Sequence, residues 1–142
     1  MKRFQPPTSI RSADSVATAT LTLQLTDLRN QLGVINVVLF ASADGFPSDV
    51  TQAFRVGSFP VTDLSLLISF TDMPFGSYAA AIHHDENQDG KVNVNTLGIP
   101  KEGIGFSNNP KILMGVPSFK KAAFAFTPDC QTIDITMKYL LR

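Results

Sequence analysis

Apolar and polar residues alternate along several short stretches of the chain. Leu21, Leu23 and Leu25, for example, alternate with threonine and glutamine residues. This period of two is typical of a β-strand that buries one face. The same reading predicts strands over residues 17–26, 34–41, 64–71, 77–84, 122–126 and 132–139. Because turn residues separate these stretches and no long helical pattern occurs, we expect an all-β fold, an antiparallel β-sandwich of about seven strands.

Other regions lack this alternation. Residues 1–16 are polar and contain two adjacent prolines, so they predict a flexible N-terminal arm before a single β-sandwich domain over residues 17–142. Residues 86–120 form one long loop, which we expect to be ordered because apolar residues recur along it. Capping signals predict short helical turns at residues 109–111 and 118–120, the second capped by Ser118. Residues 48–54 fit either a helical turn or an edge strand.

The composition indicates a globular protein without strong charge. Hydrophobic residues make up 44% of the chain, charged residues 17%, and the formal net charge is zero. A nucleic-acid partner normally requires a basic patch, so none is expected. No apolar run approaches the roughly 20 residues of a transmembrane helix. Cys130 is the single cysteine, which excludes an intramolecular disulfide, and no nearby histidine or lysine activates it.

The candidate chemistry is concentrated after the strand at residues 77–84. Oxygen-bearing side chains recur at alternate positions, Asp85, Asn87 and Asp89, and Gly90 then allows a sharp turn. This spacing resembles the calcium-loop pattern D-x-[DN]-x-[DN]-G, in which Lys91 would add its backbone carbonyl. We therefore predict a Ca²⁺ site formed by Asp85, Asn87, Asp89, Lys91 and Asn93.

The loop departs from the calcium pattern at its twelfth position, where Thr96 stands in place of a bidentate glutamate. Glu102, Asn95 or water would have to compensate, so the expected affinity is weak, roughly millimolar to tens of micromolar. The alternative is that these side chains only accept hydrogen bonds from their own backbone and stabilise a turn without any ion. An EF-hand is not expected, because a strand precedes the loop and no helical pattern follows.

A rival interpretation uses other polar residues near the same loop. His83 and His84 should point to opposite faces of their strand, so they cannot easily bind one ion together. We expect His84 at the rim of the core, bonded to a loop carbonyl, and His83 at the surface. The rival is a small-ligand or hydrolytic site of His84, Asp85, Glu102 and Ser107, and a pocket joining these side chains would favour it. Ser107 lacks the G-x-S-x-G sequence of a nucleophile elbow.

Three long stretches carry a resemblance to known proteins. Y-A-A-A-I-H-H-D-E-N-Q-D-G-K-V-N-V-N, G-I-P-K-E-G-I-G-F-S-N-N and P-S-F-K-K-A-A-F together resemble a bacterial family known as domain of unknown function 2141. The resemblance extends from about Thr18 to Tyr139. Members of that family typically carry a signal peptide, which implies a periplasmic or secreted protein. In this chain no apolar segment follows Lys2 and Arg3, which favours either a cytoplasmic protein or a missing export signal.

A shorter stretch bears on the fold. F-T-D-M-P-F-G-S-Y, residues 70–78, is similar to the turn and strand L-P-x-G-x-Y of transthyretin-like and collagen-adhesin B-type sandwiches. It implies a transthyretin-like or immunoglobulin-like sandwich, and neither resemblance brings a known reaction. We therefore predict a non-catalytic binding or structural module that presents a surface to a protein or glycan. A purely structural loop, with strand addition at a sheet edge as the function, is a further alternative.

Overall fold

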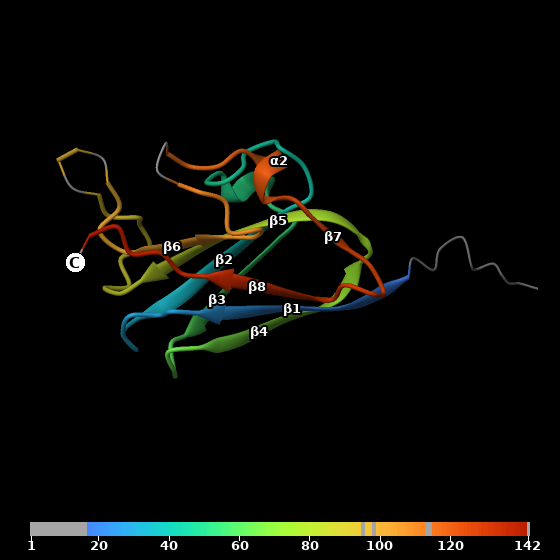
Figure 1. Ribbon diagram of the computed structural model, residues 1–142, viewed down its shortest axis with the longest axis horizontal. Helices are drawn as coiled ribbons and strands as arrows, with labels where there is room; N and C mark the ends of the chain where they lie inside the picture. Colours follow the sequence, from blue (N-terminus) through green and yellow to red (C-terminus); the bar gives the residue numbers. More distant parts are fainter. Residues whose placement is uncertain (1–16, 95, 98, 113–114, 142) are drawn as a thin grey trace, which may run out of the picture.

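The computed structural model describes residues 17–94, 96–97, 99–112 and 115–141, so the expected arm at residues 1–16 lies outside the described residues. The described residues form eight strands and two short helical turns (Figure 1). The elements are β1 (Thr18–Thr26), β2 (Val34–Phe40), the 3₁₀ turn η1 (Val50–Gln52), β3 (Arg55–Pro60), β4 (Leu66–Pro74), β5 (Gly76–Asp85), β6 (Gly103–Phe106), α2 (Phe119–Ala122), β7 (Phe124–Phe126) and β8 (Thr132–Thr136).

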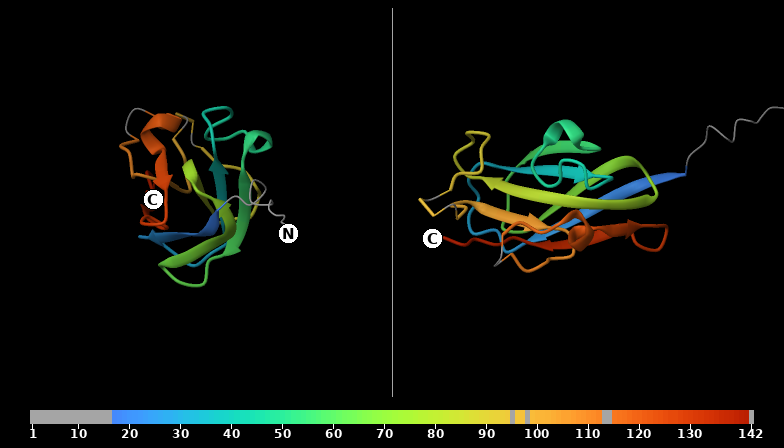
Figure 2. Two further views of the ribbon diagram at one scale, coloured as in Figure 1. Left: turned by 90° about the vertical axis from the view of Figure 1, so that its right-hand side faces the viewer. Right: turned by 90° about the horizontal axis from the view of Figure 1, so that it is seen from above.

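The strands make two facing sheets. One has the order β4-β1-β8, and the other has the order β3-β2-β5-β6, with β7 paired to the start of β5. Figure 2 shows the two layers from two further directions. The predicted all-β sandwich is confirmed, with eight described strands in place of about seven. One pair departs from the antiparallel expectation, because β8 runs parallel to β1 with Leu23 opposite Ile133.

The core lies between the sheets and explains the alternating pattern. The leucines of β1 at positions 21, 23 and 25 are fully buried, as are Ile35, Val37 and Leu39 of β2. β5 adds Tyr78 and Ile82 to the same cluster. Since alternate residues of a strand point to opposite faces, Val38, Ala81 and His83 lie on the outer face of the larger sheet.

A second, smaller cluster covers one end of that outer face. It contains residues of β5, β6 and α2, against which a further α2 side chain and side chains from two loops pack. Ser118 caps α2, because its side chain accepts a hydrogen bond from the backbone N–H of Lys121, as predicted. The order expected for the long loop is therefore confirmed over its described part. The cluster consists of Ala79, Ala81, Ile104, Phe106 and Ala122, packed by Phe46, Ile112 and Phe119.

Two strands were absent from the sequence prediction. β6 lies inside the loop predicted at residues 86–120. Its sequence shows no alternation of apolar and polar residues, because glycines occupy the positions that face the core. A Cβ on Gly103 would lie 2.3 Å from the Tyr139 ring, and one on Gly105 would lie 2.9 Å from the sulfur of Met137. β3 is a half-buried edge strand that contains Gly57 and ends at Pro60, so it too has a weak pattern.

The structure corrects one predicted helical turn and decides the ambiguous segment. No helix forms at residues 109–111, because Asn108 and Asn109 adopt left-handed backbone conformations with φ of 65° and 46°. The Asn109 side chain instead bonds the backbone of β8, accepting from the N–H of Thr136 at 2.8 Å. The ambiguous segment at 48–54 forms η1, capped by Asp49.

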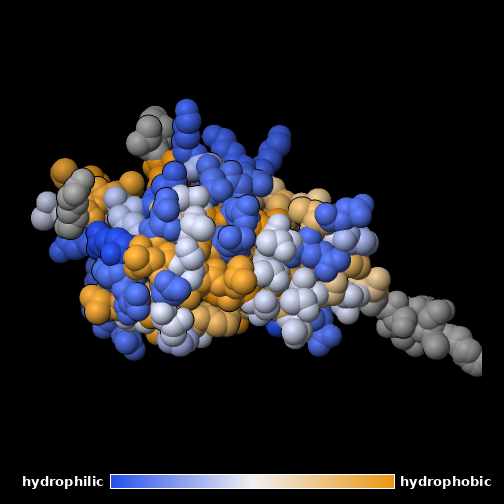
Figure 3. Space-filling view, turned by 60° about the horizontal axis from the view of Figure 1, so that its bottom comes forward, coloured by the Kyte–Doolittle hydropathy of each residue, from blue (hydrophilic) through white to orange (hydrophobic). Residues whose placement is uncertain are grey.

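Apolar side chains also reach the surface. Figure 3 shows them among polar side chains on one face of the molecule. A search of the described residues for a helix long and apolar enough to cross a membrane found none.

Candidate functional site

The end of β5 separates the two histidines, as the alternation predicts. His84 points into the core and is fully buried. Its Nε2 lies 2.7 Å from the carbonyl oxygen of Leu32, and its Nδ1 lies 2.7 Å from the hydroxyl of Tyr139. The predicted bond from His84 to a loop carbonyl is confirmed. Both ring nitrogens are used, so His84 connects the β1–β2 loop to the C-terminal segment.

Asp85 closes the turn that follows β5. Its side chain is almost fully buried and accepts backbone N–H bonds from Asp89 at 3.2 Å and Gly90 at 2.8 Å. Gln88 and Gly90 have positive φ angles of 57° and 75°, which bend the chain back onto this carboxylate. The carboxylate therefore holds the loop in a closed form, because two backbone donors converge on it.

The other predicted oxygen ligands gather on the outer side of the same turn. Asn93 donates from its side-chain amide to the Asp89 carboxylate at 2.9 Å, and the Asn87 amide lies 3.4 Å from that carboxylate. The side chains of Asn87 and Asn93 also lie 3.4 Å apart. Thr96, at the twelfth position, is exposed, and Asn95 lies outside the described residues.

Asp89 is exposed but surrounded by donors. Its carboxylate accepts a 3.0 Å bond from the backbone N–H of Lys91. This bond, followed by the bond from the Asn93 amide, lowers the pKa of Asp89 below its usual value. Asp89 is therefore a carboxylate at neutral pH, and the loop carries the charge that a cation requires.

Glu102 lies next to this loop, just before β6, and it is buried with an exposed fraction of 5%. Its carboxylate accepts backbone bonds from Glu86 at 2.9 Å and Asn87 at 3.4 Å. It also lies 3.0 Å from Nε2 of His83, within hydrogen-bonding distance. Glu102 thus fixes the first residues of the loop through the N–H groups of Glu86 and Asn87.

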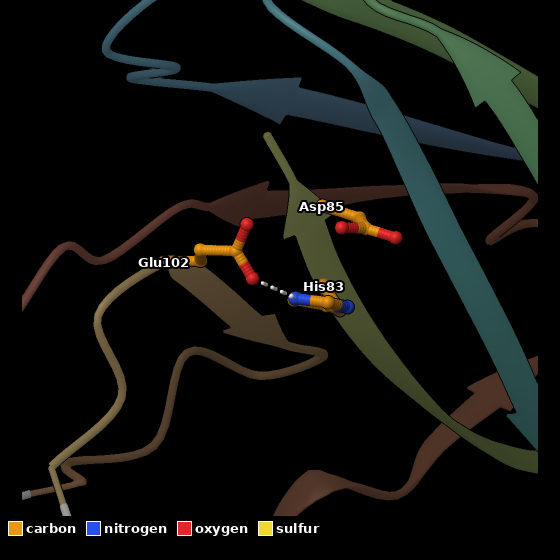
Figure 4. Close-up of side chains that lie close together, drawn as sticks. All are labelled: His83, Asp85 and Glu102. Atoms are coloured by element: carbon orange, nitrogen blue, oxygen red, sulfur yellow. Dashed lines mark hydrogen bonds and ion pairs between the residues drawn. The ribbon is translucent and has the colours of Figure 1, made fainter. Parts of the chain in front are cut away.

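His83, Asp85 and Glu102 form a compact group (Figure 4). One ligand atom from each side chain lies within 4.8 Å of the others, close enough for all three to contact one metal ion. His83 was expected at the surface, and this prediction is wrong. Only 12% of its side chain is exposed, and its Nε2 contacts Glu102. The pattern on β5 alone could not reveal this pairing, because Glu102 directly precedes β6, a strand that the sequence analysis did not predict.

Arg29 stabilises the base of the loop. It forms a bidentate ion pair with Glu86, with nitrogen–oxygen distances of 2.6 and 3.0 Å. It also donates to the carbonyls of Leu141 and Lys101 and lies over the Tyr139 ring at 4.7 Å. This guanidinium therefore joins the β1–β2 loop, the β5–β6 loop and the C-terminal segment.

The ion pair between Arg29 and Glu86 predicts how the thermal stability of the protein changes at acidic pH. The Arg29 guanidinium, with help from the Asn30 amide, lowers the pKa of Glu86 below its usual 4.5. A carboxylate with a lowered folded-state pKa stabilises the fold above its unfolded-state pKa, and this stability is lost as pH falls through the folded value. Between about pH 6 and pH 3, thermal melts should therefore show a smaller fall in Tm for Glu86→Gln than for the wild type. Equal falls would contradict this role of Glu86.

The four residues of the rival site are divided by the fold. His84 faces the core, whereas Ser107 lies beyond the far end of β6 and is fully buried. The Ser107 hydroxyl accepts from the N–H of Ala80 at 2.9 Å and donates to the carbonyl of Ala122. Only Asp85 and Glu102 of the four come together. The Ser107 hydroxyl therefore has a structural role, as a bridge between β5 and the end of α2.

A groove lies on the outer face of the larger sheet. It has a volume of 750 Å³. None of the rival-site residues is among those that line it, but Gly90, Val92 and Val94 of the β5–β6 loop form part of its wall. The candidate calcium loop therefore borders a concave surface, a relation that the sequence did not predict.

Comparisons with known proteins identify the family but no relative of known function. A search of curated proteins and a search of solved structures found no match, so the transthyretin-like description remains a prediction. The model of a bacterial family described as "uncharacterized protein conserved in bacteria (DUF2141)" matches residues 23–134, well over half of the chain. The chain therefore belongs to the bacterial DUF2141 family.

Proposed function

We propose that the protein is a non-catalytic binding module whose β5–β6 loop is stabilised by calcium or a similar hard cation. The observation that carries the proposal is the convergence of oxygen-bearing side chains in residues 85–93. The carboxylate of Asp89 lies within 3.4 Å of both loop amides, and the Asp85 carboxylate closes the same turn. Calcium is bound in proteins by carboxylate, amide and carbonyl oxygens of this kind.

The loop can present these oxygens without refolding. A half-turn of the Asn87 or Asn93 amide exchanges its nitrogen and oxygen, so that each amide offers an oxygen to a cation. Asp85 uses two bonds to hold the backbone, and a carboxylate has about four acceptor positions, so acceptor capacity remains. Lys91 would contribute its backbone carbonyl, and water would complete the six to eight ligands that calcium takes.

The same chemistry implies a weak site. Thr96 cannot supply the bidentate carboxylate of a high-affinity loop, and the nearby Glu102 is already engaged with His83 and two backbone N–H groups. Affinities of roughly millimolar to tens of micromolar suit the calcium of an extracellular setting. We therefore place the module in the periplasm or outside the cell, where a protein or glycan is the natural class of partner.

The non-catalytic part of the proposal rests on the division of the rival site. A hydrolase needs its nucleophile, base and polarising groups around one reacting atom. Here His84 and Ser107 are buried in separate hydrogen-bond networks at opposite ends of β6. The loop that would bind calcium forms a wall of the groove instead, so a cation would shape a binding surface.

The proposal predicts a saturable rise in Tm when the metal-free protein is titrated with calcium. A ligand that binds only the folded state stabilises it by RT ln(1 + [L]/Kd), about 2.7 kcal/mol at one hundred times Kd. Asp89→Ala should abolish the rise, because it removes the exposed carboxylate at the centre of the converging side chains. Asp44→Ala, which removes another exposed loop carboxylate, should retain it.

Magnesium serves as the control for ionic strength and charge. It requires shorter bonds and stricter octahedral geometry, so it should give a much smaller shift. No change in Tm at about 10 mM calcium, a concentration above the expected Kd range, would contradict the cation site. The turn would then be a set of side-chain-to-backbone hydrogen bonds that needs no ion.

A further inference from the structure

The groove on the outer face of the larger sheet collects exposed apolar side chains. Five of the chain's exposed valines line it, and their exposed fractions range from 47% to 66%. Exposed apolar residues scattered singly are ordinary, but a group of them around one concavity marks a binding site. These valines are Val50, Val56, Val92, Val94 and Val116.

The floor of the groove has an apolar end and a polar end. One cross-strand row runs Val56, Val38, Ala81 and Phe106, and the next runs Ser58, Asn36, His83 and Ile104. The first row is wholly apolar, whereas three of the four side chains in the second can form hydrogen bonds. The two rows lie side by side on one face of the same four strands.

His83 gives the polar end a defined chemistry. Its Nε2 lies 3.0 Å from Glu102, whose carboxylate also accepts two backbone N–H bonds, so this ring nitrogen is already engaged. The other ring nitrogen, Nδ1, can form a hydrogen bond to a ligand, as a donor or as an acceptor. Within the described part of the chain it has no hydrogen-bond partner, and His83 is one of the residues that line the groove.

Among the described residues that line the groove, none is an aspartate, glutamate, lysine or arginine. The polar side chains among the lining residues are Asn36, Ser48, Ser58 and His83. A charged headgroup would lose its hydration here without gaining an opposite charge. An uncharged hydroxyl, by contrast, both donates and accepts, so it can bond Nδ1 of His83 in either role.

We propose that this groove binds a small uncharged amphiphile, with an aliphatic body along the apolar row and a hydroxyl at Nδ1 of His83. Its volume of 750 Å³ fits the range of about 300–1,000 Å³ typical of small-molecule sites. The inference deepens the proposed binding role by naming the class of ligand, and it does not depend on the cation. Since Gly90, Val92 and Val94 form one wall, a stabilised loop would also stabilise the site.

The test is an NMR titration of the ¹⁵N-labelled protein with 1-octanol, and with sodium octanoate as the charged counterpart. Octanol should shift the amides of the floor saturably, above all those near Val38, Val56 and His83. It should bind at least about fivefold more tightly than octanoate at neutral pH, because the carboxylate finds no cation. No saturable shift, shifts elsewhere, or equal binding of octanoate would overturn the proposal.

Two substitutions sharpen the test. Val56→Lys places a charge on the groove floor at a side chain that is already exposed, so it should weaken octanol binding at least about tenfold without unfolding the chain. Leu67→Lys, at an apolar position on the other sheet that is 70% exposed against 58% for Val56, should leave binding unchanged. Equal effects of the two variants would overturn the assignment of the site.

A substitution of His83 tests the proposed hydrogen bond between its Nδ1 and the hydroxyl of the ligand. His83→Phe should weaken octanol binding about threefold to tenfold, the value of one hydrogen bond, and should not weaken binding of the aliphatic probe cyclohexane. Equal losses for both probes would overturn the hydroxyl contact.

Repeating the titration with and without calcium separates the two proposals. Octanol binding without any response to calcium would contradict only the proposed cation site. A response to calcium without octanol binding would contradict only the proposed amphiphile site.

Discussion

Gly33→Ala is expected to destabilise the protein by roughly 3 kcal/mol, more than most single substitutions. Gly33 has a φ of +67°, a conformation that costs a residue with a Cβ about 1–2 kcal/mol. A Cβ would also lie 2.0 Å from the carbonyl oxygen of Asp85 and 2.8 Å from that of Glu86. Both obstacles are backbone atoms at the root of the loop, so relieving the clash requires that the loop itself move.

Chemical denaturation measures this effect, and Gly90→Ala is its matched control. Gly90 has a similar φ of +75°, but nothing lies within 4 Å of the Cβ position. The free energy of unfolding of the control should therefore fall only by the conformational cost, about 1–2 kcal/mol. If both variants lost the same stability, the contact between the β1–β2 loop and the start of the β5–β6 loop would not contribute as described.

Glu102→Ala is expected to cost about 3 kcal/mol. The carboxylate is buried and accepts bonds from the N–H groups of Glu86 and Asn87 and from His83. Removing it leaves these donors without their acceptor in a poorly hydrated place, at about 1–3 kcal/mol for each unsatisfied group. The loss should appear both in the free energy of unfolding and in faster hydrogen exchange at the two amides.

Glu102→Gln distinguishes the hydrogen bonds from the charge. Its amide oxygen can still accept the two backbone bonds, and its N–H group can donate to Nε2 of His83 in the other tautomer. The expected loss is therefore less than half of that for alanine. Equal losses in the two variants would show that the charge of Glu102, and not its role as an acceptor, stabilises the loop.

The sheets were largely predictable because burial repeats with the period of a strand. Leu21, Leu23 and Leu25 are all fully buried, and the strand predicted at residues 17–26 contains β1. β6 could not be predicted in the same way, because Gly103 and Gly105 replace the side chains that would have faced the core. The space they leave is filled by Tyr139, Met137 and Ile135 from a distant part of the chain.

The candidate site was predictable only where it is local. The spacing of Asp85, Asn87 and Asp89 is a property of one turn, in which the Asn87 amide lies 3.4 Å from the Asp89 carboxylate and the Asp85 carboxylate accepts from the N–H of Gly90. The pairing of His83 with Glu102 and the groove on the outer face depend on which strands become neighbours. The parallel pairing of β8 with β1 is likewise set by tertiary packing, because no local pattern encodes strand direction.

The central claim is that the β5–β6 loop binds a hard cation and thereby shapes a binding surface. The most direct measurement is an amide NMR titration of the metal-free protein with calcium. The account predicts saturable shifts concentrated at residues 86–94, lost in Asp89→Ala, with smaller shifts along the groove wall. Shifts spread evenly over the surface, or none at about 10 mM calcium, would contradict it.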